Sequence, residues 1–381
     1  MPAKKRTRAG YHWSGNMTNI ILLFIVGLII LIIGADMLVR GASRIAAAAG
    51  IPPLVIGLTI VAIGTASPEI AVSLQAASLG QGSLTLGNVI GSNIFNILFV
   101  LGVTSLVAPI VIAEQLIRFD APIMVGVSLL AFGLAVDGKL SAMDGAILIA
   151  GFLGYTVFAL RQSRKESAKV HKEYAREFAD TEKHAAWNTT KNILFMVIGL
   201  GLLVLGARWL VDSATTMAQA IGISELVIGL TVVAVGTSLP EVATSIIAAL
   251  KGESDIAVGN AIGSNIFNLL GVLGLSGVLA PNGILVASRV LTLDFLVMVF
   301  VALVCIPVFY VDDRVSRGEG MLFLSYYVLY TGYLILEASQ SSMLPAVTLF
   351  VSFYIPLTFI GLIMFTVRAR KLKKQKRNAA S

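Results

Sequence analysis

The stretch GTASPE at residues 64–69, followed by GSNIFN at 91–96, decides the fold because the chain contains both elements twice. The second copy reads GTSLPE at 236–241 and GSNIFN at 263–268, and each of its residues lies 172 positions after its counterpart. Across that offset, more than half of the positions from 54 to 102 are identical. A duplicated half with its polar residues copied indicates a site built where the two halves meet.

The composition indicates a polytopic membrane protein. Hydrophobic residues make up 57% of the chain, charged residues 13%, and the mean hydropathy is +0.89; these values are typical of a chain that mostly contacts lipid. A run of about 20 apolar residues crosses a hydrocarbon core of about 30 Å. Such runs predict eleven helical spans: 18–39, 53–79, 84–108, 121–137 and 140–160, then 191–211, 225–250, 256–280, 290–311 and 319–337, and finally 343–367.

The predicted fold is all-α, with two five-span repeats and one extra carboxy-terminal span. An odd number of spans per repeat makes the second half enter the membrane inverted relative to the first. The predicted organisation is a basic amino-terminal segment 1–17, repeat 1 at 18–160 with core motif 57–102, a linker 161–190, repeat 2 at 191–337 with core motif 229–274, an extra span 338–367 and a basic tail 368–381.

Basic residues predict the orientation. If the polar linker is cytoplasmic, 21 of the 28 Lys and Arg residues fall on its side of the membrane, as the positive-inside rule requires. We therefore expect a multi-pass protein of the plasma (inner) membrane with a cytoplasmic linker and carboxy terminus. The basic cluster in 1–17 opposes this rule, so either the basic residues of the other loops determine the orientation or the natural start is Met17. The net charge of +7 needs no nucleic acid, because the basic tail would face anionic lipid.

The rare residue types exclude several chemistries. The single cysteine, Cys305, lies in an apolar run, and the three histidines lie outside the predicted spans. A disulfide, a thiolate metal cluster and a histidine proton relay inside the membrane are therefore not expected. The spans hold no nucleophile–histidine pair and no phosphate-binding loop, so we expect neither enzyme chemistry nor a cofactor.

Two glutamates, Glu69 and Glu241, fall in the middle of predicted spans, where a charged side chain costs at least about 2.5–3.5 kcal/mol. Hydroxyl and amide side chains recur at four-residue spacing around them, which places each set on one helix face. The four polar stripes are Thr65/Glu69/Ser73, Thr237/Glu241/Ser245, Asn88/Ser92/Asn96 and Asn260/Ser264/Asn268. The stripes predict a polar interior between the halves.

Proline adds backbone oxygens to this interior. Pro68 and Pro240 lack the N–H that would bond the carbonyls of Gly64 and Gly236. Unwound backbone at bilayer depth is expected only where it is buried in protein or lines a polar cavity. Carboxylate, amide, hydroxyl and carbonyl oxygens suit Ca²⁺, and a looser set suits Na⁺.

Charge balance points to exchange. Two ionised glutamates carry about −2, which one Ca²⁺ or two Na⁺ would neutralise equally, so the two loads would exclude each other. Binding at the interface of inverted repeats, with one bundle rocking against another, would give alternating access. Mutually exclusive occupancy of this kind is the physical basis of antiport.

Structural interpretations stand beside the functional ones. The GNVIG and GNAIG stretches at 87–91 and 259–263 are typical of close helix packing, and the two glutamates could be a buried pair that stabilises the bundle. Asp120, Asp144 and Asp294 lie near span edges and are expected to be interfacial.

The paired GTSxPE and GSNxFN elements resemble the alpha-1 and alpha-2 repeats of the cation/calcium exchanger superfamily, in its prokaryotic sodium/calcium exchanger branch. The resemblance covers about residues 18–337 and implies ten core helices, with the second, third, seventh and eighth around the ions. It implies Glu69 and Glu241 as central calcium ligands, helped by the carbonyls of Thr65 and Thr237. It implies sodium sites lined by the hydroxyls of Thr65, Thr237, Ser238, Ser92 and Ser264 and the carbonyls of Ala62 and Ala234, with Asn96 and Asn268 completing the middle.

The chain departs from the family pattern at one position of this shell. The family's GTS serine is Ser238 in the second half but Ala66 in the first, where a serine follows one place later as Ser67, about 100° round a helix. One sodium site would thereby lose a hydroxyl ligand, which puts the family's three-sodium stoichiometry in doubt. The potassium-dependent branch carries aspartate where Asn268 stands, which argues against potassium cotransport.

The charge balance and the resemblance together predict a secondary antiporter that expels Ca²⁺ in exchange for Na⁺. H⁺/Ca²⁺ exchange and K⁺-dependent Na⁺/Ca²⁺ exchange are the alternatives within this class, and a cation channel is the alternative from another class.

Overall fold

The structure, a computed structural model, describes residues 17–49, 51–177, 185–220 and 234–379. The described part of the first half contains α1 (Met17–Ala49), α2 (Pro53–Ile56), η1 (Gly57–Val61), α3 (Ala62–Thr65), α4 (Ser67–Ser78), α5 (Gly82–Phe95), η2 (Asn96–Leu101), α6 (Gly102–Val107), β1 (Ile110–Val111), η3 (Leu116–Asp120), α7 (Ala121–Ala135), β2 (Lys139–Leu140) and α8 (Ala142–Glu177). Segments labelled η are π-helical and continue neighbouring α-helices.

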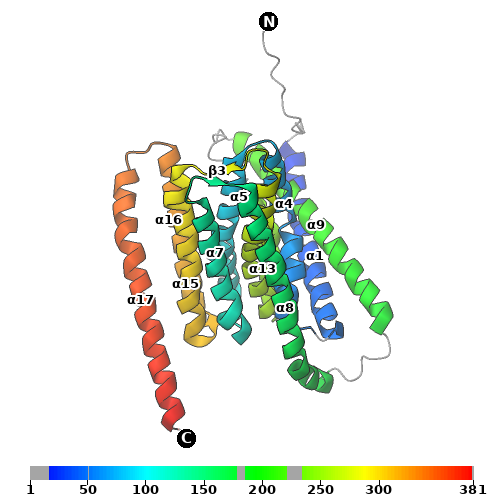
Figure 1. The fold of residues 1–381 in the computed structure, drawn as a ribbon. Helices are drawn as coiled ribbons and strands as arrows, with labels where there is room; N and C mark the ends of the chain where they lie inside the picture. Colours follow the sequence, from blue (N-terminus) through cyan, green and yellow to red (C-terminus); the bar gives the residue numbers. More distant parts are fainter. Residues whose placement is uncertain (1–16, 50, 178–184, 221–233, 380–381) are drawn as a thin grey trace.

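The described part of the second half repeats this order. It contains α9 (Ala185–Ala220), α11 (Ala234–Gly236), α12 (Leu239–Leu250), α13 (Ser254–Phe267), η6 (Asn268–Leu273), α14 (Gly274–Leu279), β3 (Ile284–Leu285), η7 (Val290–Phe295), α15 (Leu296–Asp312), β4 (Arg314–Val315) and α16 (Arg317–Ala338), and α17 (Leu344–Ala379) follows it. Figure 1 shows the helices as one bundle, with α17 at one edge and α1 beside α9 at the other.

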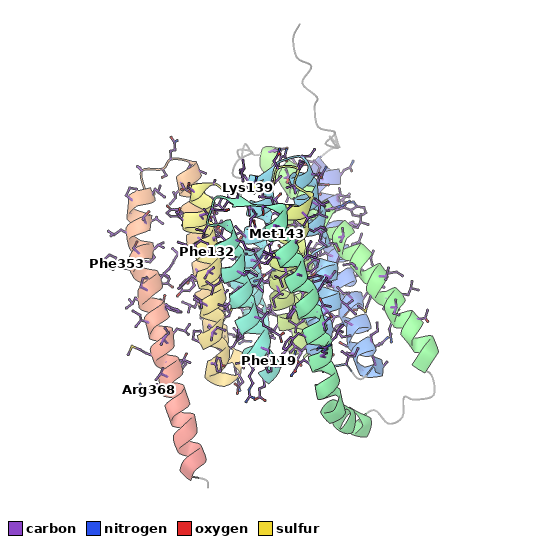
Figure 2. The ribbon with its side chains drawn as sticks, in the orientation of Figure 1. Phe119, Phe132, Lys139, Met143, Phe353 and Arg368 are labelled. Carbon is purple, nitrogen blue, oxygen red and sulfur yellow. The ribbon has the colours of Figure 1, made fainter. Side chains whose placement is uncertain are left out.

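The described residues form an all-α polytopic membrane protein. Nine of their helices are long and apolar enough to span a membrane, and a tenth span is a pair, Pro53–Thr65 and Ser67–Ser78, bent by 51°. These ten match ten of the eleven predicted spans; the other, predicted at 225–250, includes residues outside the described ranges and ends in α12. Large apolar side chains lie on the outside of the bundle (Figure 2), where Phe353 is 71% exposed and Met143 70%. A surface of this kind suits lipid.

The contact between α1 and α9 shows that the halves are inverted. A Cβ added at Gly34 would lie 2.7 Å from the carbonyl oxygen of Gly199, and one at Gly27 would lie 3.1 Å from that of Gly206. Gly199 is the repeat counterpart of Gly27, and Gly206 is that of Gly34. Each glycine therefore faces the counterpart of the other, which is the reciprocal pattern of a two-fold interface, and the two helices run antiparallel. Small residues let the two backbones approach this closely.

Two short antiparallel ribbons tie the halves together at opposite ends of the bundle. In one ribbon β1 pairs with β4, with Ile110 opposite Val315, and in the other β2 pairs with β3, with Lys139 opposite Leu285. The single span of η3 and α7 separates β1 from β2, so the ribbons cap opposite faces; β3 lies at the upper face in Figure 1. Each ribbon joins a loop after a third span to a loop between fourth and fifth spans of the other half, as inverted repeats require.

Two of the aspartates expected near the membrane interface, Asp120 and Asp294, are buried within the protein. Asp120 is fully buried; Tyr155 donates a hydrogen bond to its Oδ1 at 3.1 Å and Gln115 Nε2 donates to its Oδ2 at 3.2 Å. Asp294 is 9% exposed and accepts hydrogen bonds from Tyr330 and Arg289, both at 2.9 Å. In both halves, therefore, an aspartate early in the fourth span is held by a tyrosine of the fifth. Partners allow burial that hydropathy alone does not predict.

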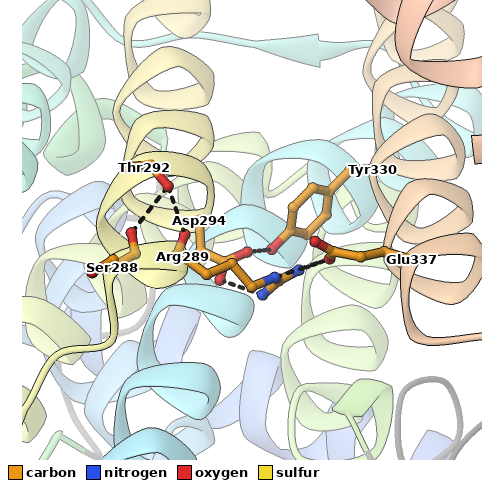
Figure 3. A network of polar contacts seen from close by, with 6 residues as sticks. All are labelled: Ser288, Arg289, Thr292, Asp294, Tyr330 and Glu337. Carbon is orange, nitrogen blue, oxygen red and sulfur yellow. Dashed lines mark hydrogen bonds and ion pairs between the residues drawn. The ribbon is translucent and has the colours of Figure 1, made fainter. Parts of the chain in front are cut away.

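The Asp294 contacts belong to a wider network near one end of the bundle (Figure 3). The guanidinium of Arg289 pairs with Asp294 at 2.9 Å and with Glu337 at 2.5 Å. Glu337 lies near the end of α16, so the network joins the start of η7 to the end of α16. Hydrogen bonding to Glu337 raises the pKa of Arg289. The network fixes the last two spans of the second half against each other.

Candidate ion-binding site

Both glutamates lie in the first turn of a helix that restarts after a break. Ala66 precedes α4 and Ser238 precedes α12, with ψ angles of 7° and 9° that interrupt the helical path, and each new helix has a proline within its first two positions. Proline is tolerated there because its missing N–H would have no partner in the first turn. Glu69 and Glu241 are each 1% exposed. The positive end of each helix dipole therefore favours the carboxylate that the sequence places there.

Glu69 lies in a cluster of oxygens that comes from both halves. Ser238 donates a hydrogen bond to Glu69 Oε1 at 2.8 Å, and Ser92 on α5 donates to the same oxygen at 3.5 Å. The two hydroxyl oxygens are 3.3 Å apart. Three oxygens from α4, α5 and the break before α12 therefore lie within 3.5 Å of one another.

Glu241 lies in the mirrored cluster, which lacks one hydroxyl. Ser264 Oγ lies 3.5 Å from Glu241 Oε1 and 3.5 Å from the carbonyl oxygen of Ala62. Thr65 Oγ1 lies 3.3 Å from that carbonyl oxygen as well. The position that matches Ser238 is Ala66, which is fully buried and offers only a methyl group. The repeat is therefore asymmetric where the two carboxylates bind their hydroxyl partners.

The displaced serine of the first half, Ser67, does not restore the missing hydroxyl. Its Oγ donates to the carbonyl oxygen of Gly64 at 2.6 Å, so it caps the carbonyl that Pro68 leaves without a donor. The prediction that the helix break leaves this carbonyl without a donor is therefore wrong for Gly64. The matching residue in the second half is Leu239, which cannot cap the carbonyl of Gly236 in this way.

Two asparagines hold the glutamate helices in place. Asn88 Nδ2 donates to Ser73 Oγ at 2.9 Å and to the backbone oxygen of Glu69 at 3.2 Å. The counterpart Asn260 repeats both contacts, at 3.1 Å to Ser245 and 3.4 Å to the backbone of Glu241, and also accepts from Thr65 Oγ1 at 2.9 Å. Ser73 and Ser245 therefore contact the asparagine stripe beside the site.

The GSNIFN copies meet at the centre of the bundle. Asn96 Nδ2 donates to Asn265 Oδ1 at 3.1 Å, and Asn265 Nδ2 donates to the backbone oxygen of Asn93 at 3.1 Å. Asn96 and Asn268 each begin a π-helical segment, η2 and η6, and such segments are frequent at functional sites. No role for Asn265 or Asn93 was predicted from the sequence. Their presence in both copies of the motif was the available signal.

Five of the predicted ligand residues leave a buried oxygen without a hydrogen-bond partner: Glu69 Oε2, Glu241 Oε2, Asn96 Oδ1, Asn268 Oδ1 and Thr237 Oγ1. The two asparagine oxygens can only accept hydrogen bonds, and so can the two glutamate oxygens when the glutamates are ionised. A buried acceptor without a donor is costly. A cation satisfies such oxygens, and hard oxygen ligands suit Ca²⁺ and Na⁺. Within the described ranges no three His, Cys, Asp or Glu residues form a metal-sized group, so this candidate site has two carboxylates and otherwise neutral oxygens.

The structure buries most of the predicted ligands. Thr65, Ser92, Ser238, Ser264, Asn96 and Asn268 are all at most 4% exposed, and Ala62 is fully buried. Thr237 is partly buried, although its hydroxyl oxygen is not accessible. Ala234 begins α11, but its own side chain lies outside the part of the chain whose side chains are described. Their roles as ion ligands stay predictions.

Known proteins resemble this chain in sequence and in the arrangement of their helices. The family described as sodium/calcium exchanger protein matches residues 19–161 and 191–336. The inner membrane protein YrbG of Escherichia coli K12 is 38% identical over 317 residues, which cover 82% of this chain and 95% of the relative. The sodium/calcium exchanger MaX1 of Methanosarcina acetivorans is 33% identical over 339 residues, which cover 81% and 96%.

The solved structures agree with the sequence relatives. A structure of the sodium-calcium exchanger NCX_Mj aligns with a TM-score of 0.71 at 29% identity, covering 84% of this chain and all of that one. The family match spans both inverted halves and includes both glutamates and both GSNIFN elements. The chain therefore belongs to the sodium/calcium exchanger family.

Proposed function

We propose that the chain is a secondary antiporter that moves Ca²⁺ out of the cell in exchange for Na⁺. One observation carries the proposal: Glu69 and Glu241, one from each inverted half, are fully buried, and each leaves a carboxylate oxygen without a hydrogen-bond partner. Buried unpaired carboxylate is unfavourable in a medium of low dielectric. The protein is therefore expected to change between its inward-open and outward-open states only when ions occupy the site.

The charge of the site explains why two loads exclude each other. Two carboxylates carry about −2, so one Ca²⁺ or two Na⁺ neutralise them, whereas both loads together would leave excess positive charge in a buried site. Ser92, Ser264, Ser238, Thr65 and Thr237 supply neutral oxygens around the carboxylates, and Asn96 and Asn268 supply amide oxygens between them. The carbonyls of Ala62 and Ala234 complete the proposed ligand set.

Alternating access follows from the inverted halves. The site is formed at broken helices where the halves meet, which is the arrangement in which one bundle can rock against another around a fixed site. We place the protein in the inner membrane with its linker and carboxy terminus in the cytoplasm. In Figure 1 the lower ends of α8, α9 and α17 lie at one face, so the described ends of the linker lie on the same side as the described part of the tail. The proposed substrates are Na⁺ and Ca²⁺, and the proposed activity is transport without enzyme chemistry.

Calcium uptake into proteoliposomes tests this proposal. An outward gradient of Na⁺, K⁺ or protons is imposed, one at a time, on vesicles that contain the purified protein. Uptake of radioactive Ca²⁺ into the vesicles is then followed. Uptake driven by an outward Na⁺ gradient is expected. Uptake that requires K⁺ or an outward proton gradient would instead support K⁺-dependent or H⁺/Ca²⁺ exchange, and Ca²⁺ flux that ignores every opposing gradient would support a channel.

A further inference from the structure

We propose that this chain exchanges two Na⁺ for each Ca²⁺, without net charge movement, and that Ala66 sets this ratio. The inference rests on the proposed function and concerns the asymmetry between the two carboxylate clusters. Ser238 gives the Glu69 cluster a hydroxyl that the Glu241 cluster does not have, because Ala66 occupies the matching position. The two flanks of the site are therefore unequal as monovalent cation sites.

The Glu69 cluster has the spacing of a cation site. Oxygens at right angles around a cation at about 2.3–2.6 Å, as for Ca²⁺, lie about 3.3–3.7 Å apart. The Ser92 and Ser238 hydroxyl oxygens are 3.3 Å apart, and Ser92 lies 3.5 Å from Glu69 Oε1. The remaining edge, 2.8 Å from Ser238 to Glu69, is a hydrogen bond that lengthens when a cation replaces the hydroxyl proton as partner of the carboxylate. This cluster is suited to one Na⁺.

The Glu241 cluster is less suited to Na⁺. The Ala66 methyl cannot ligate a cation, and the nearby Ser67 hydroxyl is bonded to the Gly64 carbonyl at 2.6 Å. Thr65 Oγ1 also donates elsewhere, to Asn260 Oδ1 at 2.9 Å. Ser264 and the Ala62 carbonyl remain, each at the limit of hydrogen-bonding distance from its neighbour in the cluster.

Charge points the same way. The described residues place two carboxylates in the site and no third His, Cys, Asp or Glu close enough to complete a group of three. Two Na⁺ neutralise two carboxylates, and a third would leave one uncompensated positive charge in a buried site. Only additional oxygen dipoles could stabilise that charge, and position 66 lacks the hydroxyl that its counterpart has. Two Na⁺ per Ca²⁺ is therefore the ratio that this site favours.

The equilibrium Ca²⁺ gradient in proteoliposomes measures the ratio directly. With a tenfold Na⁺ gradient and no membrane potential, two Na⁺ per Ca²⁺ give a Ca²⁺ ratio of about 100, and three give about 1,000. A tenfold K⁺ gradient with valinomycin imposes a potential, which shifts the Ca²⁺ ratio about tenfold if one net charge moves per cycle and leaves it unchanged if none moves. A K⁺ gradient without valinomycin serves as the control for K⁺ transport.

The wild-type protein is expected to reach a Ca²⁺ ratio of about 100 that does not respond to valinomycin. Ala66→Ser restores the missing hydroxyl. Its Ca²⁺ ratio is expected to rise toward the third power of the Na⁺ gradient and to change when valinomycin imposes a membrane potential. Ser67→Ala is the matched control, because it changes a neighbouring hydroxyl that faces the backbone, and is expected to behave as the wild type.

A wild-type ratio that shifts tenfold with valinomycin would overturn the inference. A wild-type and an Ala66→Ser protein that both exchange two Na⁺ would overturn the role of position 66. If the wild type takes up Ca²⁺ without any dependence on Na⁺, the proposed function itself is wrong, and that outcome is distinct from both. The wild-type measurement decides the ratio even if Ala66→Ser fails to fold.

Discussion

Replacing Ser238 with alanine is expected to weaken Na⁺ binding more than Ca²⁺ binding. Ser238 is fully buried and donates to Glu69 Oε1 at 2.8 Å from the other half. In the proposed Na⁺-loaded state the same oxygen ligates the cation, and the variant leaves no group in its place. The central oxygens of Glu69, Glu241, Asn96 and Asn268 are untouched, so Ca²⁺ retains its main ligands.

The magnitude follows from the value of a hydroxyl at a charged partner. Such an interaction contributes about 1.5–3 kcal/mol, which corresponds to a loss of about 10- to 150-fold in the equilibrium constant for the Na⁺ load. If two Na⁺ displace one Ca²⁺, the Na⁺ concentration for half-displacement rises with the square root of that loss, or about 3- to 12-fold. The Na⁺ concentration for half-displacement should therefore change, while the affinity for Ca²⁺ in the absence of Na⁺ should not.

Displacement of bound radioactive Ca²⁺ by Na⁺ in detergent-solubilised protein provides the assay, with Ser67→Ala as the matched control. The Ser67 hydroxyl caps the Gly64 carbonyl and should leave the half-displacing Na⁺ concentration unchanged. An unchanged value for Ser238→Ala, or an equal rise in both variants, would refute the assignment of Ser238 to the Na⁺ shell.

Three further changes test other parts of the structure. Glu69→Gln and Glu241→Gln keep the side-chain shape but remove one charge each, so each should abolish Ca²⁺ exchange in proteoliposomes while the protein elutes as a single species in size-exclusion chromatography; transport by both variants would refute the site. Gly263→Ala would place a Cβ 2.6 Å from backbone atoms of the second span and should cost about 1–3 kcal/mol through overpacking, which a lower Tm would reveal and an unchanged Tm would contradict. Glu337→Gln breaks the ion pair between Glu337 and Arg289, in which the side chains are 33% and 45% exposed, respectively. The variant should lose less than about 1 kcal/mol of folding stability and keep its exchange activity; loss of transport would show that the network acts on the site.

Hydropathy and the repeat predicted most of the fold. Ten of eleven spans agree with helices in the described residues, because span length is set by bilayer thickness and the 172-residue offset marks equivalent helices. The polar stripes also predicted a buried polar interior, and Thr65, Glu69 and Ser92 are all buried in the structure. Inversion followed from the odd number of spans, and the reciprocal glycine contacts between α1 and α9 agree with it.

The sequence could not supply contacts that depend on side-chain direction. Ser67 lies next to the missing GTS serine, but only its hydrogen bond to Gly64 shows that it faces the backbone rather than the ions. Asp120 lies near a span edge, and its burial depends on Tyr155, 35 residues later. The contact from Asn96 to Asn265 crosses between halves, and periodicity within one helix carries no information about such a partner.

The central claim is that Na⁺ and Ca²⁺ occupy one shared site between Glu69 and Glu241. Equilibrium binding of radioactive Ca²⁺ to the purified protein at a series of Na⁺ concentrations tests it most directly. We predict that Na⁺ raises the apparent Kd for Ca²⁺ in proportion to the second power of its concentration, while the amount of Ca²⁺ bound at saturation stays constant. An apparent Kd that does not change with Na⁺ would contradict the claim, because it would mean that both ions bind at the same time.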